Sequence, residues 1–584
     1  MNPKIYYPAK KFASDFWMFL EGNRTKFVFL LLMIFGAGFS GYISIYLLGK
    51  IVDFFIIYNV EDDLRDFYIY VAIIAVLGVV ATLVRQSAKL SLLTLGAGLR
   101  RKSRIIALSK LVDLELKWHE KENTGSKIQK ISGGSQNIYD ALRMLSNEGA
   151  TIITGIAGAA TTFLFLDIKY GLFAGIYLIL FLSIHAYFMK KKSIIQDQLS
   201  HISEKLSGKV HESASNILAV KSLGLKENIK SSLESHEDEY YRIWYKNRNL
   251  ESLRSKTFNI LASLGYSLFV LFIGLDAARG IIQAATIFVF ASYFHRLREG
   301  TQVLMDSSDR FIEIKSGIGR IMSILDQKTI ERESPHLAEV SPQWRRLDFA
   351  NVCFKYKNRW VLKDFNLSIK RGENIGIVGR SGSGKSTLAK LILGLYEPQE
   401  GQILIDGKPL QEYKQSSINR QISIVLQESE MFNISLAENI SISDEKPDVP
   451  KLAIAAKAAE LENIIRKLPQ GIKTLMGERG YKLSGGERQR VGIARAVYSR
   501  ASMIILDEAT SHLDSKTETQ IQKNLGIVLK DKNIVVIAHR LSTLRALDRI
   551  IVMHAGKIVE EGTFEELVKK RGFFYGLYRA QRAH

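Results

Sequence analysis

The sequence predicts two parts of different fold class: a polytopic α-helical membrane part with six transmembrane helices, followed by an α/β part. Long apolar runs are confined to the first half of the 584 residues. A polar stretch with two prolines covers residues 326–345. From about Leu347 the chain changes to short β-branched strands, glycine turns and helices. We therefore expect a membrane domain over 1–325, a linker over 326–345 and an α/β domain over 346–584.

Six apolar runs predict the membrane-spanning helices. They cover residues 27–48, 67–84, 152–166, 171–188, 258–275 and 281–294. The first is long enough to cross a bilayer core, whereas several others are shorter than the roughly 20 residues that a spanning helix needs. We expect those helices to continue into the more polar sequence that follows. A single short run could be a buried helix of a soluble protein, but six in half a chain indicate a membrane protein.

The formal net charge of +21 is concentrated in particular loops. Basic residues precede the first run and follow the second and the fourth, whereas the connection around residues 61–66 is acidic. Because cytoplasmic loops carry the excess of Lys and Arg, we expect both termini and the two long basic loops in the cytoplasm, in a multi-pass membrane protein. Membrane lipids are expected partners. Nucleic acid is not, because no recognition module accompanies the charge.

The segment before the first run places three phenylalanines at helical spacing, Phe12, Phe16 and Phe19. This spacing favours a short amphipathic helix that lies in the membrane interface. The alternative is a simple polar segment that leads into the first membrane helix.

A glycine-rich loop follows a buried-strand pattern over 373–378 and precedes a helical stretch. Its residues are Gly379, Arg380, Ser381, Gly382, Ser383, Gly384, Lys385, Ser386 and Thr387. Glycines let backbone N–H groups approach phosphates, and the helix N-terminus favours their negative charge. Lys385 would reach the β- and γ-phosphates, and Ser386 would hold Mg²⁺. The loop therefore predicts a site for a nucleoside triphosphate with Mg²⁺.

Polar residues also stand at the ends of three other predicted strands. Asp507 ends one strand and could reach the metal, and the adjacent Glu508 could polarise a water at the γ-phosphate. His539 follows another strand and could sense the γ-phosphate. Gln427 follows a third and could join Mg²⁺ and water. A lone histidine or glutamine is more often structural, so these assignments depend on the surrounding motifs.

The predicted triphosphate site gives no role to the turn Ser484-Gly485-Gly486, which is followed by Glu487. Its amides and the N-terminus of the next helix would form a second anion site. Since Lys385 already holds one triphosphate, the second site would serve a nucleotide bound to another copy of the domain. The alternative is a plain helix start, which needs no pair of glycines.

The motifs GRSGSGKST, VLQES, LSGGERQR, MIILDEAT, SHLD and IAHRLST together resemble an ATP-binding cassette (ABC) nucleotide-binding domain. With membrane spans before the cassette, the chain resembles a half-transporter of the bacterial lipid and multidrug exporters. In the membrane part, WHEKENTGSKIQKIS and VHESASNILAVKSLG resemble the family's first and second intracellular loops. The resemblance covers nearly all residues and implies an α/β P-loop fold for the second part.

The resemblance implies a role for each matching position. Tyr356 would stack on adenine, residues 379–387 would bind phosphates and Mg²⁺, and Gln427 would sense Mg²⁺. Glu478 would contact intracellular loops, and the residues Ser484, Gly485, Gly486 and Glu487 would cap the ATP of the opposite copy. Asp507 would bind the metal, Glu508 would be the general base, Asp514 would signal across the dimer and His539 would hold the γ-phosphate. His512 departs from the alanine usual in the family, which removes no catalytic group.

The expected function is ATP-driven export of a hydrophobic or amphipathic substrate, a lipid, drug or peptide. A complete catalytic set is consistent with a homodimer, although a related half-transporter could be the partner. The alternative function is an ATP-gated channel or a transport regulator with the same domain architecture. A soluble cassette ATPase of DNA repair lacks the spans, and a peptide exporter with a fused protease needs a longer first segment and a cysteine in it.

Four cations near the ends of apolar runs bear on the cargo: Arg85, Lys89, Arg296 and Arg298. Charges at membrane depth are costly and often functional, so they could bind an anionic amphiphile such as a lipid headgroup. The alternative is that their side chains extend to the cytoplasmic interface.

Overall fold

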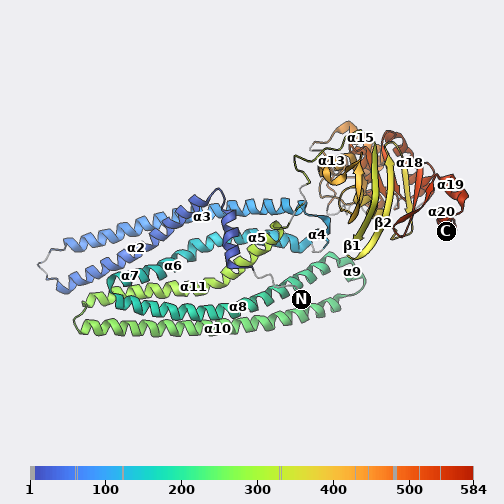
Figure 1. Ribbon diagram of the computed structural model, residues 1–584. Coiled ribbons are helices and arrows are strands. Elements are labelled where there is room, and N and C mark those ends of the chain that lie inside the picture. The colour runs from blue at the N-terminus through green and yellow to red at the C-terminus, as the bar shows by residue number, and fades with distance from the viewer. Residues whose placement is uncertain are drawn as a thin grey trace. The chain divides into compact units, whose positions relative to one another are not determined.

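The computed structural model describes residues 7–59, 61, 63–120, 124–327, 329, 332–427, 429–444, 446–477, 483–511, 513–538 and 541–582. They form two compact units, one of Met1–Leu114 with Trp118–Thr329, the other of Glu115–Lys117 with Ile330–His584. Figure 1 shows long helices running side by side in the first unit, and strands covered by helices in the second.

The helical elements before residue 330 are α1 Ala9–Phe19, α2 Arg24–Ile57, α3 Arg65–Asp113, α4 Leu116–His119, α5 Thr124–Met144, α6 Ala150–Ile153, α7 Ala159–Leu166, α8 Ile168–Ser215, α9 Ile217–Ser222, α10 Lys226–Ala278 and α11 Ala284–Leu325. Two π-helical segments, η1 Leu145–Gly149 and η2 Thr154–Gly158, separate α5, α6 and α7. As expected from the short apolar runs, α3, α8 and α10 continue well beyond them, because polar residues on a helix can extend into water.

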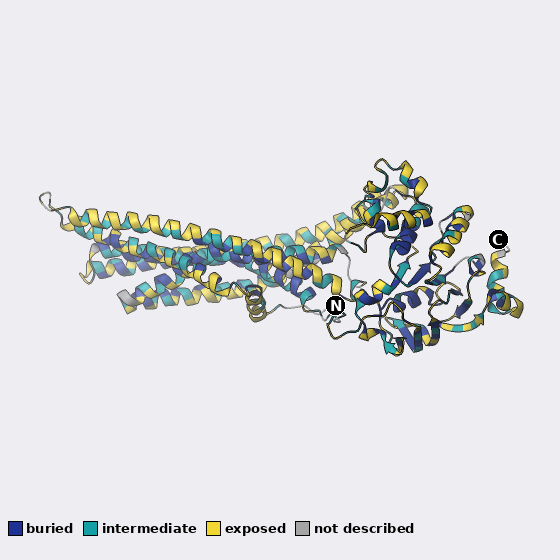
Figure 2. Ribbon diagram, turned by 90° about the horizontal axis from the view of Figure 1, so that it is seen from above, coloured by how far each residue is buried: buried dark blue, intermediate teal, exposed yellow. Residues whose placement is uncertain are grey.

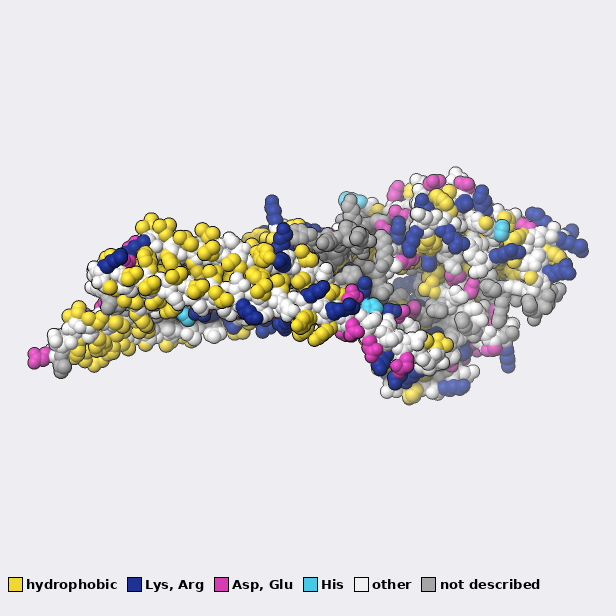
Figure 3. All heavy atoms as spheres, turned by 90° about the horizontal axis from the view of Figure 1, so that it is seen from below, with side chains coloured by type: hydrophobic (Ala, Val, Ile, Leu, Met, Phe, Trp, Pro, Cys, Tyr) yellow, Lys and Arg dark blue, Asp and Glu magenta, His cyan; other side chains and the backbone are white. Residues whose placement is uncertain are grey.

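Four helices of the described residues are long and apolar enough to cross a membrane: α2, α3, the Ile168–Gln196 part of α8, and α10. The run predicted over 152–166 lies across α6, η2 and α7, and the run over 281–294 lies at the start of α11. Exposed apolar side chains are typical of a surface that contacts lipid, and Figure 3 shows such side chains over the helical unit.

The phenylalanines of α1 point into the helical unit. Phe16 and Phe19 are buried, and Phe12 packs against Phe311 of α11 with ring centroids 5.4 Å apart. Trp17 and Met18 are exposed instead. The amphipathic helix predicted here is therefore present, but its phenylalanine face contacts protein, and Trp17 and Met18 are the residues free to contact lipid.

Glycines bring the backbones of η2 and α11 into close contact. A Cβ added at Gly155 would lie 2.8 Å from the Cα of Gly300. Beside this contact, the Tyr42 hydroxyl of α2 donates to the carbonyl of Thr154 at 2.8 Å. A π-helical turn leaves a carbonyl without its usual partner, so this hydroxyl satisfies a group that the irregular helix exposes.

The second unit contains two sheets. Its strands are β1 Arg346–Tyr356, β2 Arg359–Lys370, β3 Ile375–Gly379, β4 Glu400–Ile405, β5 Lys408–Pro409, β6 Ile422–Val425, β7 Met503–Asp507, β8 Asn533–Ile537, β9 Arg549–His554 and β10 Lys557–Gly562. The first sheet is antiparallel with the order β2-β1-β4-β5. The second has the order β10-β9-β3-β8-β7-β6, and all its neighbours pair in parallel except β10 with β9.

The helices of this unit are α12 Lys385–Ile392, α13 Gln415–Gln421, α14 Leu436–Ile440, α15 Val449–Ala458, α16 Glu462–Lys467, α17 Gly485–Tyr498, α18 Ser515–Val528, α19 Phe564–Lys570 and α20 Phe573–Arg582, with the 3₁₀ turns η3 Leu410–Glu412, η4 Gly471–Lys473 and η6 Leu541–Leu544. The strands β3 and β7 are almost fully buried, as expected for parallel strands covered on both faces. Figure 2 shows buried strands, in dark blue, inside this unit.

The described residues of the segment predicted as a linker pack on one unit or the other. Asp326 pairs with Lys11 in the first unit at 2.6 Å. Arg332 pairs with Glu397 in the second at 2.9 Å. Trp344 is buried there and donates from Nε1 to Ser502 at 2.8 Å. The polar composition of this stretch therefore reflects surface ion pairs as well as a connection.

Candidate nucleotide-binding site

Parallel strands bring the predicted site residues to one edge of the second sheet. The strands β3, β6, β7 and β8 run in parallel, so their carboxyl ends share that edge, where ligands bind in open α/β sheets. The phosphate loop follows β3, Gln427 follows β6, and Asp507 ends β7. The sequence order alone does not place these segments together; the sheet does.

The phosphate loop has the backbone that its glycines permit. Gly379 has a φ of 157°, and a Cβ there would collide with the carbonyl oxygen of Met553. Gly384 precedes α12 with a φ of 106°, a left-handed conformation that favours glycine. Both conformations turn the chain tightly from β3 into α12, which begins at Lys385.

Lys385 is buried and donates to two backbone carbonyls, that of Gly379 at 2.9 Å and that of Arg380 at 3.2 Å. Burial lowers the pKa of Lys385, and the charges of Glu508 and Asp507 act in the opposite direction. A buried ammonium whose direct acceptors are neutral carbonyls is compensated only in part by these nearby carboxylates, so an anionic ligand at the loop is favoured.

Ser386 and Asp507 present two hard oxygens side by side. The Ser386 hydroxyl donates to Oδ1 of Asp507 at 3.3 Å. Burial raises the pKa of Asp507, and Glu508 adds to this effect, whereas Ser386 and Lys385 lower it. A carboxylate that is costly to ionise alone is favoured once a divalent cation binds it, and hydroxyl and carboxylate oxygens are ligands that Mg²⁺ accepts.

The loop also holds a buried hydroxyl without a hydrogen bond among the described residues. Ser383 is 3% exposed, and its Oγ has no partner there. A buried polar atom without a partner costs free energy, so a ligand oxygen at this loop would satisfy it. Together with Lys385 and the Ser386–Asp507 pair, this orphaned donor fits a triphosphate with a divalent cation.

Glu508 is held by its backbone and by a residue that sequence reasoning missed. Its φ is 50°, unusual for a residue with a side chain, and its N–H donates to the carbonyl of Ile537 at 3.0 Å. The Gln489 side chain of α17 is buried and donates to the Glu508 carbonyl at 2.9 Å. Gln489 therefore joins the helix of the Ser-Gly-Gly turn to the expected general base. Its place in LSGGERQR is the signal that could have found it.

The Ser484 turn is a helix N-terminus with reciprocal caps. The N–H of Glu487 donates to Ser484 Oγ at 3.3 Å, and the N–H of Ser484 donates to the Glu487 carboxylate at 2.7 Å. The helix begins at Gly485, directly after Ser484. This capping box explains Ser484 and Glu487 but not Gly485 and Gly486, which it does not require.

Some of the remaining predicted site residues lie in described parts of the structure, and the others do not. Tyr356 ends β1 and packs edge-on against Tyr396 with centroids 5.4 Å apart. Gln427 is exposed, and Asp514 caps α18 by accepting from the N–H of Thr517 at 2.9 Å. Among the loop residues, Arg380, Ser381, Gly382 and Ser386 are exposed and Thr387 is buried. His539, Glu478 and His512 lie outside the described residues.

One of the four membrane cations lines a groove of the helical unit. The groove has a volume of about 540 Å³ and is bordered by Tyr266, Phe288, His295, Arg296 and Glu299, among others. Arg296 pairs with Glu299 at 3.6 Å, and both side chains are partly exposed. Arg85, Lys89 and Arg298 are not among the described residues that line it.

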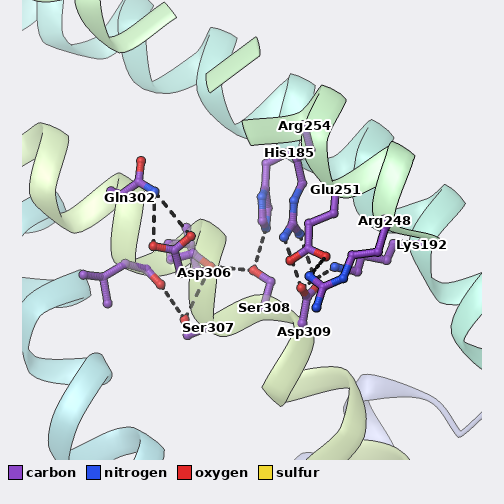
Figure 4. Close-up of polar contacts among 12 residues, drawn as sticks. His185, Lys192, Arg248, Glu251, Arg254, Gln302, Asp306, Ser307, Ser308 and Asp309 are labelled. Atoms are coloured by element: carbon purple, nitrogen blue, oxygen red, sulfur yellow. Dashed lines mark hydrogen bonds and ion pairs between the residues drawn. The ribbon is translucent and has the colours of Figure 1, made fainter. Parts of the chain in front are cut away.

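A second charged cluster of the helical unit was not predicted. Asp309 of α11 accepts from both Nη atoms of Arg254 on α10, at 3.2 and 3.1 Å, and from Lys192 on α8 (Figure 4). Lys192 and Arg254 are buried, whereas the Asp309 side chain is 30% exposed. Next to it, Ser308 contacts His185 at 3.1 Å. Residues far apart in sequence form this cluster, so no local motif marks it.

Comparison with known proteins identifies the family of the chain. The model of the ABC transporter family matches residues 362–511, and that of the ABC transporter transmembrane region matches 27–299. A putative multidrug export ATP-binding/permease protein of Staphylococcus aureus is 31% identical over 80% of this chain and 81% of its own. An ATP-dependent lipid A-core flippase of Alkalilimnicola ehrlichii is 48% identical over 238 residues, 40% of each chain.

The fold is also that of a solved exporter. The structure of a bacterial Atm1-family ABC exporter with ATP bound has a TM-score of 0.87 with this chain, at 24% identity, covering 97% of this chain and 99% of that one. The two family models cover the helical region and the phosphate loop respectively, and the names of the relatives support ATP-driven export. The chain therefore belongs to the ABC transporter family.

Proposed function

We propose that two copies of this chain form an exporter that uses MgATP to move a hydrophobic or amphipathic substrate from the cytoplasmic side or inner leaflet outward. Each copy would cross the membrane six times, with both termini and the nucleotide-binding domain in the cytoplasm of a bacterial cell. The proposed domains are 1–325, the connection 326–345, and 346–584. The observation that carries the proposal is the meeting of Lys385, Ser386 and Asp507 at one sheet edge in a chain with an apolar helical unit.

The residues at this edge have separable tasks. Lys385 would exchange its two carbonyl acceptors for phosphate oxygens, and the loop amides would bind the remaining charge. Ser386 and Asp507, with Gln427, would hold Mg²⁺, which supplies charge stabilisation at the transferring phosphoryl group when it is bound. Glu508 would accept a proton from the attacking water. His539 would contact the γ-phosphate, and Tyr356 would stack on adenine.

The second copy would complete each site. The N-terminus of α17 carries amides at Gly485 and Gly486 and the positive end of a helix dipole. Placed against a nucleotide held by Lys385 of the partner subunit, it would cap the phosphates from the other side. Asp514 would lie between the two sites. Closure of two such sites by ATP would drive the helical units between inward and outward states.

The groove at Arg296 supports an amphipathic cargo. It combines aromatic side chains, Tyr266 and Phe288, with the partly exposed charges of Arg296 and Glu299. Small-molecule sites combine apolar side chains with polar groups that fix the orientation of the ligand, and this groove has both. Anionic lipids that stimulate ATP turnover in wild type but not in Arg296→Ala would support this contact. Equal stimulation in both would place the cargo elsewhere.

One test addresses the catalytic assignment. Glu508→Gln should retain ATP binding and lower steady turnover about 10²- to 10⁴-fold, the usual contribution of a general base. Undiminished turnover would overturn the assignment.

A mixing experiment addresses the shared site. Lys385→Ala and Ser484→Arg chains should each be inactive alone. Coexpressed, they should regain one intact site, because Lys385 of one chain then faces Ser484 of the other. Recovery of activity also argues against a need for a different half-transporter. No recovery in mixed dimers would contradict the shared site.

An ATP-gated channel is the second candidate, since it would use the same nucleotide sites. Electrical recording on reconstituted vesicles distinguishes the two. ATP-dependent conductance without net cargo accumulation would favour the channel.

A further inference from the structure

The last described helix, α20, is fixed at its start by a single carboxylate. Glu560 of β10 accepts the N–H groups of Phe573 at 2.6 Å and Phe574 at 2.9 Å. Gly572 precedes them, and a Cβ there would collide with the same carboxylate. A negative group at a helix N-terminus is stabilising, so this contact sets the position of α20 on the sheet.

The buried face of α20 shares a hydrophobic cluster with the strand ends of the nucleotide site. Phe574 is fully buried, and its cluster includes Val378 and Ala538. Val378 directly precedes the phosphate loop, and Ala538 is the last residue before His539. Close-packed interiors transmit displacements, so the position of α20 and the positions of these two strand ends are coupled.

Two further contacts reach the site segments themselves. The Arg380 guanidinium of the phosphate loop lies over the Phe573 ring, 5.7 Å from its centroid. At the other end of α20, Gln581 Oε1 accepts the N–H of Leu541, the first residue of η6, at 2.9 Å. The helix therefore touches the loop that would bind phosphates and the segment that follows the expected γ-phosphate contact.

We propose that α20 positions two described parts of the nucleotide-binding unit, the phosphate loop through Phe573 and the start of η6 at Leu541 through Gln581. Phe573 and Gln581 are positioning residues and do not touch the nucleotide. Phe573 holds Arg380 of the phosphate loop in place, so it sets the KM for ATP. Gln581 fixes the segment needed at the γ-phosphate, so it sets kcat. The proposal rests on the nucleotide site proposed above.

The test measures ATP turnover of the full chain in lipid vesicles. Phe573→Leu keeps apolar volume but removes the ring face, and should raise the KM for ATP about 2- to 5-fold with kcat kept, the range expected for an exposed cation–π contact. Phe573→Tyr should restore the wild-type KM. Gln581→Leu should lower kcat about 2- to 10-fold with KM kept, the range of one hydrogen bond. Gln581→Glu keeps the acceptor and should recover kcat.

The matched control is Arg579→Ala, which changes an exposed residue of the same helix. The inference is wrong if Phe573→Leu and Gln581→Leu behave like Arg579→Ala, or if both lower kcat and thermal stability together without rescue by the conservative variants. Glu508→Gln, measured in parallel, separates the two proposals. Persistent turnover in that variant overturns the proposed site, whereas loss of turnover there with unchanged α20 variants overturns only the positioning role.

Discussion

Two buried lysines, Lys192 in the helical unit and Lys385 in the nucleotide unit, are satisfied in different ways. Lys192 pairs with the Asp309 carboxylate, which Arg254 also binds. Lys385 donates to the neutral carbonyls of Gly379 and Arg380. An ion pair compensates a buried charge within the fold, whereas carbonyl dipoles compensate it incompletely. The structural Lys192 thus has a counter-ion of the chain in direct contact. Lys385 has neutral carbonyls in direct contact instead, and a bound anionic ligand would supply its counter-charge.

The difference between the two lysines predicts that the largest effect of a substitution on stability is at Asp309, the counter-ion of Lys192. Asp309→Asn leaves Lys192 and Arg254 buried without a counter-charge, so the free energy of unfolding should fall by about 3–5 kcal/mol. Denaturant unfolding in detergent measures it. Asp306→Asn is the matched control, because Asp306 on the same helix is exposed and accepts from the neutral Gln302 (Figure 4).

Replacing all three charged residues of the cluster by apolar ones tests whether the lost stability comes from the unpaired charges. Replacing the whole cluster by Lys192→Met, Arg254→Met and Asp309→Leu should recover most of the lost stability, since apolar packing often replaces a buried ion pair without loss. If Asp309→Asn is as stable as wild type, the cluster does not hold the three helices together.

At Lys385 we expect a substitution to weaken ATP binding but to leave the stability of the nucleotide-free protein unchanged. Lys385→Met removes the charge that would meet the triphosphate, so ATP binding should weaken by about 2–5 kcal/mol. The stability of the protein without nucleotide should not fall, because Lys385 donates to neutral carbonyls and the carboxylates of Asp507 and Glu508 act on it only through their charge. Calorimetric titration with ATP and thermal unfolding with and without ATP measure the two quantities. A variant that unfolds at lower temperature without ATP would contradict the comparison.

The pH dependence of the KM for Mg²⁺ tests the role of Asp507 as a metal ligand. Burial raises the pKa of Asp507, so its carboxyl keeps a proton at pH values where an ordinary aspartate is ionised. Mg²⁺ needs the ionised form, so the apparent KM for Mg²⁺ should rise as pH falls through this raised pKa, by at most about tenfold per pH unit. Above that pKa it should be constant. ATP binding without Mg²⁺ is the control, and a KM for Mg²⁺ independent of pH would remove Asp507 from the metal site.

The smallest effect is expected at an exposed ion pair. Lys11 and Asp326 pair at 2.6 Å, but nearly half of each side chain is exposed. Water and salt screen such pairs, so Lys11→Ala should leave the unfolding midpoint unchanged at high ionic strength. Thermal unfolding at two salt concentrations measures it. A loss as large as that of Asp309→Asn would show that burial is not what separates the two pairs.

The local motifs determined much of the nucleotide site. The phosphate loop, the Asp507–Glu508 pair and the Ser484 turn were predicted because each is continuous in sequence, and a short segment carries its own backbone preferences. The structure brings Ser386 to Asp507 as expected. Gln489 was missed because its hydrogen bond to Glu508 crosses from a helix to a strand end.

The sequence by itself determined the two fold classes, the apolar helices and the residues of the phosphate loop, since hydrophobic periodicity and glycine spacing are local properties. Only the tertiary structure decided that Asp309 would bind Lys192 and Arg254, and that α20 would contact both Arg380 and Leu541. Such contacts join residues that are from 40 to 193 positions apart, and their formation depends on how whole helices pack rather than on any neighbouring residue.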